Sequence, residues 1–488
     1  MSLFNMTAIP TNKRTDDAAI AELQRAFEAQ RAAFAGDRCP SLEERRCRIE
    51  KLIGMMLANR ERISEALAKD FGAHPAPASD LIEVLGVVGR AQYVLAHMEG
   101  WMKPSPRETD AAMLGTAKAY IHSQPKGVIG NIVPWNFPFD LSVGPMIEML
   151  AAGNRVILKP SEFTPACGAL LRDMVTATFD PTLVYVALGD QDLARAFSAI
   201  PWNHLLYTGN PNVGRLVMAA AARNLTPVTL ELGGKCPAIL TPGSVTAQNV
   251  ESVIGTKTIK NGQMCISVDY VLVPRQDVQR FVDHAKAFLN AAAPNYARGP
   301  ECTGIISERH LDRLAGLLQE AKDRGALIVP LEADGVIDRT SRRMPMSLVI
   351  DPPRDTRIMQ EEIFGPILPV VPYENLQDAI DGINAGERPL GLYVFSDDQA
   401  VADRVLASTT SGGAAVNTCA IQGALPSLAF GGVGMSGMGR HHGVEGFREF
   451  SNNRGIVVRG EGDIIASFYA PHSKAAAVVN AALSGTLA

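Results

Sequence analysis

The chain has 488 residues, of which 47% are hydrophobic and 20% are charged, and its formal net charge is −5. This composition is typical of a soluble globular protein, and the length is sufficient for two or three domains. The slightly acidic balance does not favour a nucleic-acid partner, and no apolar run approaches the ~18 residues of a membrane span.

The seven cysteines are scattered along the chain and form no C-x-x-C pair. Their odd number and irregular spacing argue against a disulfide framework or a zinc site, so we expect no metal and a reducing compartment. The N-terminal stretch MSLFNMTAIPTNKRTDD lacks the apolar segment of a secretory signal, and the Ala-rich C-terminal stretch is too weakly apolar for a membrane anchor. We therefore expect a soluble cytoplasmic protein.

Residues 17–100 have the apolar periodicity of helices. Within them, Ser41 and Glu44 form the S-x-x-E pattern of a capping box, which satisfies the free amides at a helix start. The stretch from Pro104 to Pro125 alternates and is rich in strand formers, which predicts a β-hairpin or an extended arm. Because two strands alone are unstable in water, we expect this arm to pair with another sheet or subunit.

Predicted strands and helices alternate from Gly127 to Leu230. Such alternation indicates a parallel sheet with helices on both faces, the doubly wound arrangement. Sheets of this kind bind ligands at the carboxyl ends of their strands. The predicted strands are Gly127–Val133, Arg155–Leu158, Leu183–Leu188, His204–Tyr207 and Thr226–Leu230, and the predicted helices are Leu141–Ala152, 164–177, 190–199 and 211–222.

A second α/β region follows Cys265. Its predicted strands are Val268–Val273 and Ser347–Ile350, and its predicted helices are Val278–Leu289 and Leu311–Arg324. No internal repeat or low-complexity linker is visible, so we expect two packed domains with a cleft between them. Glu231 and Cys265 lie near the junction of these domains in the sequence.

The hexapeptide NGQMCI at residues 261–266 is the candidate for nucleophilic chemistry. It places Cys265 in a small, turn-capable setting, and a cysteine thiolate is the protein nucleophile that needs least activation at neutral pH. A lone cysteine is more often a buried, unreactive small hydrophobe, and the hexapeptide alone does not exclude that interpretation.

The sequence ELGGK at residues 231–235 ends a predicted strand on a double glycine. A partly desolvated carboxylate at Glu231 would have a raised pKa and could act as a general base, although most such glutamates simply face solvent. The stretch EEIFGP at residues 361–366 similarly places carboxylates before a turn, with an acidic pair followed by an aromatic residue.

Three further loops follow predicted strands. Gly209 and Gly214 flank a strand-to-helix turn whose amides can face a phosphate, and this turn is equally consistent with a generic loop. In KPSE at residues 159–162, a lysine and a carboxylate could hold the hydroxyls of an adenosine ribose, and the carboxylate favours NAD over NADP. In PWNFP at residues 134–138, prolines restrict the backbone around Asn136, whose amide could stabilise a developing negative charge.

The chain resembles the NAD(P)-dependent aldehyde dehydrogenase superfamily from about residue 20 to 460. The resemblance rests on motifs in a fixed order, namely PWNFP, KPSE, YTGN, ELGGK, NGQMC, EEIFGP and AFGGVGMSGMGR. YTGN, the Asp269-Tyr270 pair and FGGVGMSGMGRHHG are similar to the class 3 branch, which includes coniferyl aldehyde and fatty aldehyde dehydrogenases.

The resemblance implies a role for each matched residue. Cys265 would attack the aldehyde, Asn136 and the Cys265 backbone N–H would hold the oxyanion, and Glu231 would activate water for thioester hydrolysis. The implied cofactor is NAD, with NADP as an alternative, and Glu362 is an alternative base. The residues implied to bind the cofactor are Lys159, Glu162, Pro134, Trp135, Gly209, Gly214, Leu232, Glu362 and Phe364.

The resemblance also implies a domain organisation. Residues 17–110 and 127–232 would bind NAD, residues 233–430 would form the catalytic domain, and residues 111–126 with 446–462 would form an oligomerisation arm. We therefore expect at least a homodimer that acts on a small aldehyde, with no membrane or nucleic-acid partner.

The substrate implied is an aromatic aldehyde such as coniferaldehyde, or a medium-chain one. Ala429 and Thr418 stand where the family usually has proline and aspartate, near the expected substrate funnel, so the analogy is weakest there. The alternatives are a semialdehyde or CoA-acylating dehydrogenase and a catalytically silent relative that binds a dinucleotide. The latter has no reason to retain Cys265, Asn136 and Glu231 together.

Overall fold

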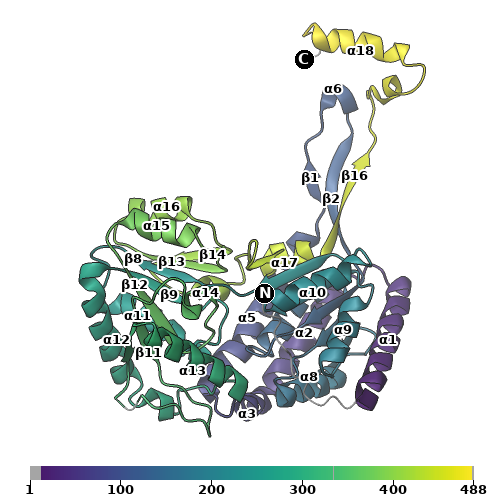
Figure 1. Cartoon of the computed structure of the whole chain (residues 1–488). Coiled ribbons are helices and arrows are strands. Elements are labelled where there is room, and N and C mark those ends of the chain that lie inside the picture. Colours follow the sequence, from purple (N-terminus) through teal and green to yellow (C-terminus); the bar gives the residue numbers. More distant parts are fainter. Residues whose placement is uncertain (1–12, 334, 486–488) are drawn as a thin grey trace.

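A computed structural model describes residues 13–333 and 335–485. Within these residues the strands form three sheets, which we call the first sheet, the second sheet and the arm sheet. The first and second sheets lie in adjacent lobes, and the arm sheet projects away from both (Figure 1).

The first sheet has the strand order β15-β7-β6-β3-β4-β5 and is parallel except for β15. This arrangement confirms the predicted doubly wound sheet. Its strands are β3 (Val128–Ile132), β4 (Arg155–Lys159), β5 (Val184–Val186), β6 (His204–Gly209), β7 (Val228–Leu232) and β15 (Gly437–Met438).

Helices cover both faces of the first sheet because its strands are apolar on both sides. In β4, Val156 and Leu158 pack into the cluster with α2, α3, α5, α7 and α8, whereas Ile157 packs into the cluster with α1, α9 and α10. The capping box of Ser41 and Glu44 is confirmed at the start of α2. These helices are α1 (Lys13–Gly36), α2 (Leu42–Ala58), α3 (Arg60–Phe71), α5 (Val87–Met102), α7 (Asp140–Ala151), α8 (Pro165–Thr178), α9 (Gln191–Ala199) and α10 (Pro211–Ala222), with α4 (Ala76–Ala78) and the π-helix η1 (Ser79–Gly86) between α3 and α5.

The second sheet has the strand order β10-β11-β12-β9-β8-β13-β14, with only β10 antiparallel among these strands. Its strands are β8 (Pro237–Leu240), β9 (Tyr270–Pro274), β10 (Leu327–Pro330), β11 (Ser347–Ile350), β12 (Ile367–Tyr373), β13 (Gly391–Phe395) and β14 (Gly413–Val416). The sequence predicts β9 and β11 but not the other strands, since short apolar runs cannot be assigned by periodicity alone. It also predicts that β9 begins two residues early, at Val268.

Helices again cover both faces of the second sheet. Ala238 and Leu240 of β8 pack with α11 and α12, while Ile239 packs with α15 and α16. Helix α13 packs over β11 and β12 in a separate cluster. The helices are α11 (Ala247–Thr258), α12 (Val278–Ala292), α13 (Glu308–Asp323), α14 (Arg357–Gln360), α15 (Leu376–Asn384) and α16 (Gln399–Ser408).

The arm sheet has the order β1-β2-β16 and is antiparallel. It joins β1 (Ser105–Arg107) and β2 (Lys118–Pro125) to β16 (Ser451–Val458), so the predicted hairpin gains a strand from the far end of the chain. Helices α6 (Ala111–Leu114) and α18 (Ser473–Leu483) lie at its far end, and α17 (Gly443–Glu449) connects it to the body (Figure 1).

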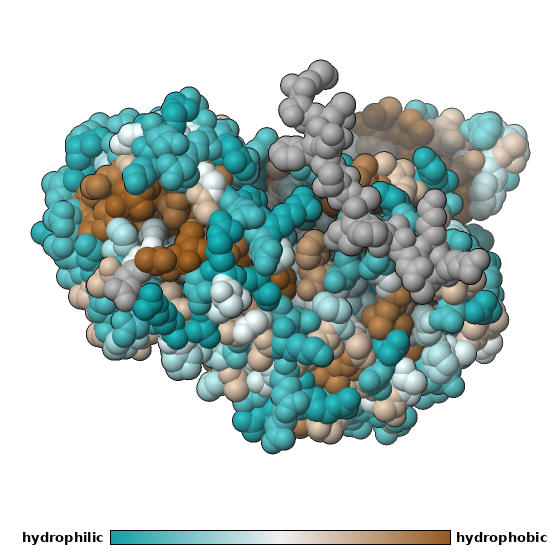
Figure 2. All heavy atoms as spheres, turned by 60° about the horizontal axis from the view of Figure 1, so that its bottom comes forward, coloured by the Kyte–Doolittle hydropathy of each residue, from teal (hydrophilic) through white to brown (hydrophobic). Residues whose placement is uncertain are grey.

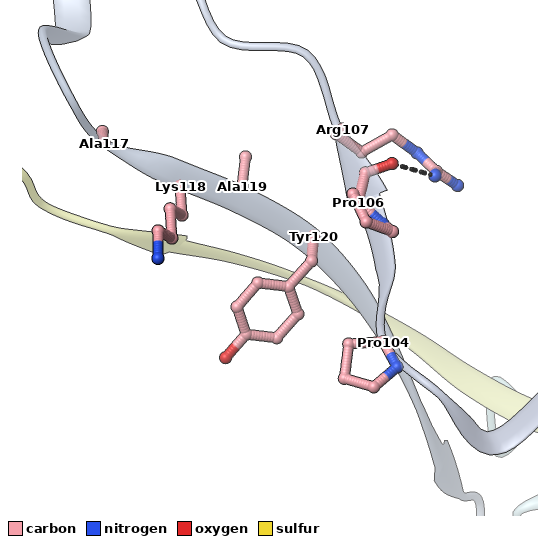
Figure 3. A pocket seen from close by; sticks show the side chains of 7 residues that line it. All are labelled: Pro104, Pro106, Arg107, Ala117, Lys118, Ala119 and Tyr120. Atoms are coloured by element: carbon pink, nitrogen blue, oxygen red, sulfur yellow. Dashed lines mark hydrogen bonds between the residues drawn. The ribbon is translucent and has the colours of Figure 1, made fainter.

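A shallow hollow of about 300 Å³ lies on this arm, far from the loops that the sequence analysis singles out. Side chains from both β1 and β2 line it (Figure 3). Its lining residues are Pro104, Pro106, Arg107, Ala117, Lys118, Ala119 and Tyr120.

The face seen in Figure 2 is largely hydrophilic, and its hydrophobic residues form separate patches. In the described part of the chain, the helices are all too short or too polar to cross a membrane.

Candidate active site

Four of the predicted loops leave the first sheet at one edge. Ile132 of β3 pairs with both Lys159 of β4 and Tyr207 of β6, and Gly209 of β6 pairs with Leu232 of β7. Because these strands are parallel, their carboxyl ends meet at the same edge. The structure therefore brings together the loops PWNFP, KPSE, the turn after Gly209, and ELGGK, as the sequence analysis expects.

The loop before Cys265 has an unusual backbone. Lys260, Asn261 and Gly262 have left-handed φ angles of +47°, +55° and +77°. A Cβ atom on Gly262 would lie 2.3 Å from the Gly365 carbonyl oxygen, so glycine is required both by φ and by this close approach. The left-handed turn thus allows the cysteine loop to pack closely against the EEIFGP turn.

The Gln263 side chain fixes the loop from inside. Its amide nitrogen donates to the Lys260 and Gly304 carbonyls at 2.9 and 3.0 Å, and its amide oxygen accepts from the Ile306 N–H at 3.0 Å. Gln263 is fully buried, whereas Cys265 two residues later is partly exposed. The loop is therefore rigidly anchored at a point from which a thiol reaches the surface.

Two carboxylates lie close enough to Cys265 to affect its thiol. Burial raises the pKa of Cys265 most, and the negative charges of Glu362 and Glu231 raise it further. The resting thiol is therefore protonated, and either carboxylate is a neighbouring proton acceptor. Buried Cys236 also lies here and donates from Sγ to the Cys265 carbonyl at 3.3 Å.

Glu231 ends β7 with a buried side chain of 2% exposure. Neither carboxylate oxygen has a hydrogen-bond partner within the described residues. Burial raises the pKa of Glu231 well above its usual value, and Arg440 partly opposes this shift. A carboxyl group in such surroundings can exchange protons near neutral pH.

Glu362 lies against the double glycine of ELGGK. A Cβ atom on Gly233 would lie 2.0 Å from Glu362 Oε2, and the Gly234 N–H donates to the Glu362 carboxylate. Burial raises the pKa of Glu362 to about 8, with Asp269 contributing in the same direction. The absence of a side chain at Gly233 is thus what allows this carboxylate to approach Cys265.

The oxyanion candidate Asn136 is buried and tied to the cysteine loop. The side-chain amide of Asn136 donates to the Gln263 backbone carbonyl at 3.2 Å, and the backbone carbonyl of Asn136 accepts from Lys260 Nζ at 2.6 Å. Lys260 also forms a buried ion pair with Glu83 of η1. The second oxygen of Glu83 accepts the Phe139 and Asp140 N–H groups at 3.0 and 2.8 Å. One ion pair therefore holds both the Asn136 loop and the cysteine loop.

Aromatic rings from both lobes meet beside this region. The Trp135 and Phe364 rings are in edge-to-face contact with centroids 5.3 Å apart. Phe364 has a left-handed φ of +52°, which is unfavourable for a residue with a Cβ atom. Trp135 and Phe364, which the sequence analysis assigns to one cofactor, therefore do lie together.

Along the sheet edge, Lys159 Nζ and Glu162 Oε2 form an ion pair at 2.7 Å. Asn210 caps α10 by accepting the Val213 N–H at 3.0 Å, and Asn210 and Asn212 at this helix start are exposed. A Cβ atom on Gly214 would lie 2.9 Å from Leu232, which packs α10 against β7. These donors and glycines fit a dinucleotide whose ribose and pyrophosphate follow the edge.

No sequence motif predicts how the groups that support these loops pair with one another. Lys260 and Glu83 carry no motif, because their partnership spans 177 residues and exists only in the folded chain. Lys235 and Asp269 do belong to quoted motifs, but those motifs do not predict that the two form an ion pair, in which Asp269 also accepts the Ile363 N–H at 2.9 Å. The left-handed Asn-Gly pair beside Lys260 is the one local signal that pointed to this region.

Among the described residues, no cluster of three or more His, Cys, Asp or Glu could hold a metal ion.

We expect Lys260→Met to destabilise the fold, because it leaves the buried Glu83 carboxylate without a counter-charge. Breaking such a pair costs on the order of 3 kcal/mol, to be measured as the free energy of unfolding in a denaturant titration. The control Lys51→Met, on the exposed surface of α2, should stay within about 0.5 kcal/mol of the unsubstituted chain. Equal stabilities for Lys260→Met and Lys51→Met would contradict the role of this pair.

Comparison with known proteins identifies the family to which this chain is similar. The family model described as "Aldehyde dehydrogenase family" matches residues 10–456. A probable coniferyl aldehyde dehydrogenase of Caulobacter vibrioides is 41% identical over 454 residues, which cover 92% of this chain and 94% of the relative.

Solved structures give the same result. The substrate-bound AldH of Staphylococcus aureus is 30% identical with a TM-score of 0.89, and the match covers 94% of this chain and 99% of that one. An aldehyde dehydrogenase of Mycobacterium tuberculosis in complex with NAD+ is 26% identical with a TM-score of 0.79, over 91% and 90% of the two chains. The chain therefore belongs to the aldehyde dehydrogenase family and is an NAD(P)-dependent enzyme that oxidises an aldehyde group.

Proposed function

We propose that the enzyme oxidises an aromatic or medium-chain aldehyde to its carboxylic acid, with NAD as the preferred cofactor. The residues that act on the substrate would be Cys265, Asn136 and Glu231. The observation that carries this proposal is the partly exposed Cys265 thiol with Glu231 and Glu362 close enough to raise its pKa. A thiol nucleophile and a buried base within reach of each other are what thioester formation and hydrolysis need.

The first step is attack of the Cys265 sulfur on the aldehyde carbon. The thiol proton passes to a neighbouring carboxylate, and the carbonyl π electrons move onto oxygen. The Asn136 amide and the Cys265 backbone N–H donate to this oxyanion, and each donor contributes on the order of 3 kcal/mol. The ion pair of Lys260 with Glu83 supports this role because it holds the Asn136 backbone in place.

A bound nicotinamide would supply the acceptor for the hydride of the tetrahedral carbon, and Trp135, Glu362 and Phe364 are the residues we assign to hold that ring beside Cys265. Loss of this hydride re-forms the carbon–oxygen double bond, so that the acyl group remains on the Cys265 sulfur as a thioester. The enzyme must then release the acyl group to regain its thiol.

We assign hydrolysis of the Cys265 thioester to Glu231. The carboxylate takes a proton from water, the hydroxyl adds to the acyl carbon, and the carbon–sulfur bond breaks to give the acid and the Cys265 thiolate. The raised pKa of buried Glu231 supports this assignment, because a stronger base removes the water proton more readily.

We assign NAD binding to the first lobe and catalysis to the second, with residues 17–110 and 127–232 binding the cofactor and residues 233–430 supplying the thiol. Lys159 and Glu162 would hold the adenosine ribose, Gly209 and Gly214 the pyrophosphate, and Pro134, Trp135, Leu232, Glu362 and Phe364 the nicotinamide end. The Glu162 carboxylate would repel a 2′-phosphate, which supports a preference for NAD over NADP.

An aromatic substrate is supported by the Caulobacter relative, whose name specifies coniferyl aldehyde. It is also supported by the partly exposed Phe430 ring, which lies with Ile266 against Gly423. Ile266 follows Cys265 directly, so a planar substrate ring could pack on Phe430 while its aldehyde reaches the thiol.

The arm supports a homodimer. Strand β16 is at the edge of the arm sheet, and its residues Val457 and Val458 are 62% and 49% exposed. An edge strand with exposed apolar residues at its end is suited to pairing with a second copy of the sheet. We propose that this dimer is cytoplasmic, which suits its seven unpaired cysteines.

With NAD and a panel of coniferaldehyde, benzaldehyde, hexanal and succinic semialdehyde, we expect NADH formation at 340 nm, fastest with an aromatic or medium-chain member. Cys265→Ala should abolish it, because the nucleophile is lost, while the exposed control Cys47→Ala should not change it. Rates with NADP should be lower. Product that requires coenzyme A, or no NADH from any aldehyde, would contradict the proposal.

For Glu231→Gln we expect a retained first equivalent of NADH and a steady-state rate reduced by about 10²- to 10⁴-fold. In the unsubstituted enzyme the hydrolysis rate should rise as the pH passes the raised pKa of Glu231, since the base acts in its ionised form. The substitution should remove this rise. If Glu362→Gln instead gave this pattern, Glu362 would be the base.

Light scattering during size exclusion should give a mass at least twice the 52.2 kDa of the chain. Val457→Lys should lower this mass, because a charge on the exposed edge of β16 disfavours strand pairing. A single species of chain mass for the unsubstituted protein would rule out the dimer.

A further inference from the structure

A buried histidine faces Glu231. His441 Nε2 lies 3.8 Å from Glu231 Oε1, and the two side chains are 1% and 2% exposed. Neither of these two atoms has a hydrogen-bond partner among the residues that the structure describes. Burying two polar atoms without hydrogen bonds costs free energy. This cost is removed if the two atoms form a hydrogen bond with each other at a later step of the reaction.

The protonation of His441 follows from its other neighbour. Nδ1 lies 3.2 Å from Arg90 Nη2, and a guanidinium can only donate, so Nδ1 must be an acceptor. Burial and the charge of Arg90 lower the pKa of His441 well below its usual value, so the ring is neutral. Its single proton is therefore on Nε2, the nitrogen that faces Glu231.

The ring is fixed in this orientation. Arg90 is bound by Glu148 through two hydrogen bonds of 2.8 and 2.6 Å, and both residues are buried. The backbone N–H of each of His441 and Phe430 donates to the carbonyl of the other at 2.8 Å. The centroids of their two rings are 5.2 Å apart. Of the two facing side chains, Glu231 is the one without such restraints.

We propose that His441 is a positioning residue that holds ionised Glu231 by donating its Nε2–H to the carboxylate during thioester hydrolysis. A displacement of about 1 Å converts the present distance into a hydrogen bond of ordinary length. The donor favours the ionised form of Glu231, which is the form that accepts the water proton. His441 keeps its own proton throughout, because Arg90 occupies the other nitrogen.

Other ionisable groups near this pair belong to neighbouring parts of the fold. Arg440 lowers the pKa of Glu231 and Glu449 raises it, while His442 is neutral because of its burial. Arg440 and Arg90 both lower the pKa of Glu231 through space, whereas His441 faces one of its oxygens directly. His441 thus lies between the buried pair of Arg90 and Glu148 and the Glu231 carboxylate.

This inference rests on the proposed role of Glu231, and two variants test it. His441→Leu removes the donor, whereas His441→Gln retains an amide that can accept from Arg90 and donate to Glu231. With benzaldehyde and NAD, we expect His441→Leu to form the first equivalent of NADH at nearly the unsubstituted rate and then to turn over about 10- to 100-fold more slowly. Acyl-enzyme on Cys265 should accumulate, as measured by intact mass after an acid quench, and His441→Gln should regain most of the rate.

A double substitution separates positioning from a structural effect. If His441 acts through Glu231, adding His441→Leu to Glu231→Gln should slow acyl-enzyme hydrolysis no further. An equal further loss in that background would overturn the proposal, and so would a first turnover of His441→Leu slowed as much as its steady state. Absence of NADH formation by the unsubstituted enzyme would instead refute the proposed function itself.

Discussion

The burial of the Lys260–Glu83 ion pair is the constraint on which the site depends. Both charges are removed from water, which costs several kcal/mol for each unless every remaining donor and acceptor is used. Here Glu83 also accepts two N–H groups at the start of α7, and Lys260 also donates to the Asn136 carbonyl. The pair therefore tolerates only one arrangement of η1, the PWNFP loop and the cysteine loop.

The left-handed backbone before Cys265 is a result of the same constraint. Lys260 and Asn261 have positive φ angles, which are unfavourable for residues with a Cβ atom and persist only where the surroundings hold them. The ion pair at Lys260 and the side-chain hydrogen bonds of Gln263 provide that restraint. As a result, the thiol leaves the loop at a defined position although the loop has no regular secondary structure.

A second buried pair, Arg90 with Glu148, plays the corresponding role on the other side of the site. It lies between α5 and α7 and reaches His441, which in turn faces Glu231. The helices that cover one face of the first sheet thus do more than bury apolar surface. They place a buried charged pair behind His441 and Glu231, where a hydrogen bond is electrostatically stronger than it would be in water.

The sequence by itself determined the alternating strands and helices of the first sheet, since apolar periodicity and glycine turns are local properties. It also identified the loops at the carboxyl ends of those strands and, through ordered motifs, the family. Only the tertiary structure decided what supports them. Lys260 meets Glu83, and Arg90 meets His441, across 177 and 351 residues of chain, and no local pattern encodes a contact at such a separation. The short strands of the second sheet were undecided for a related reason, because four or five apolar residues become a strand only when a neighbouring strand pairs with them.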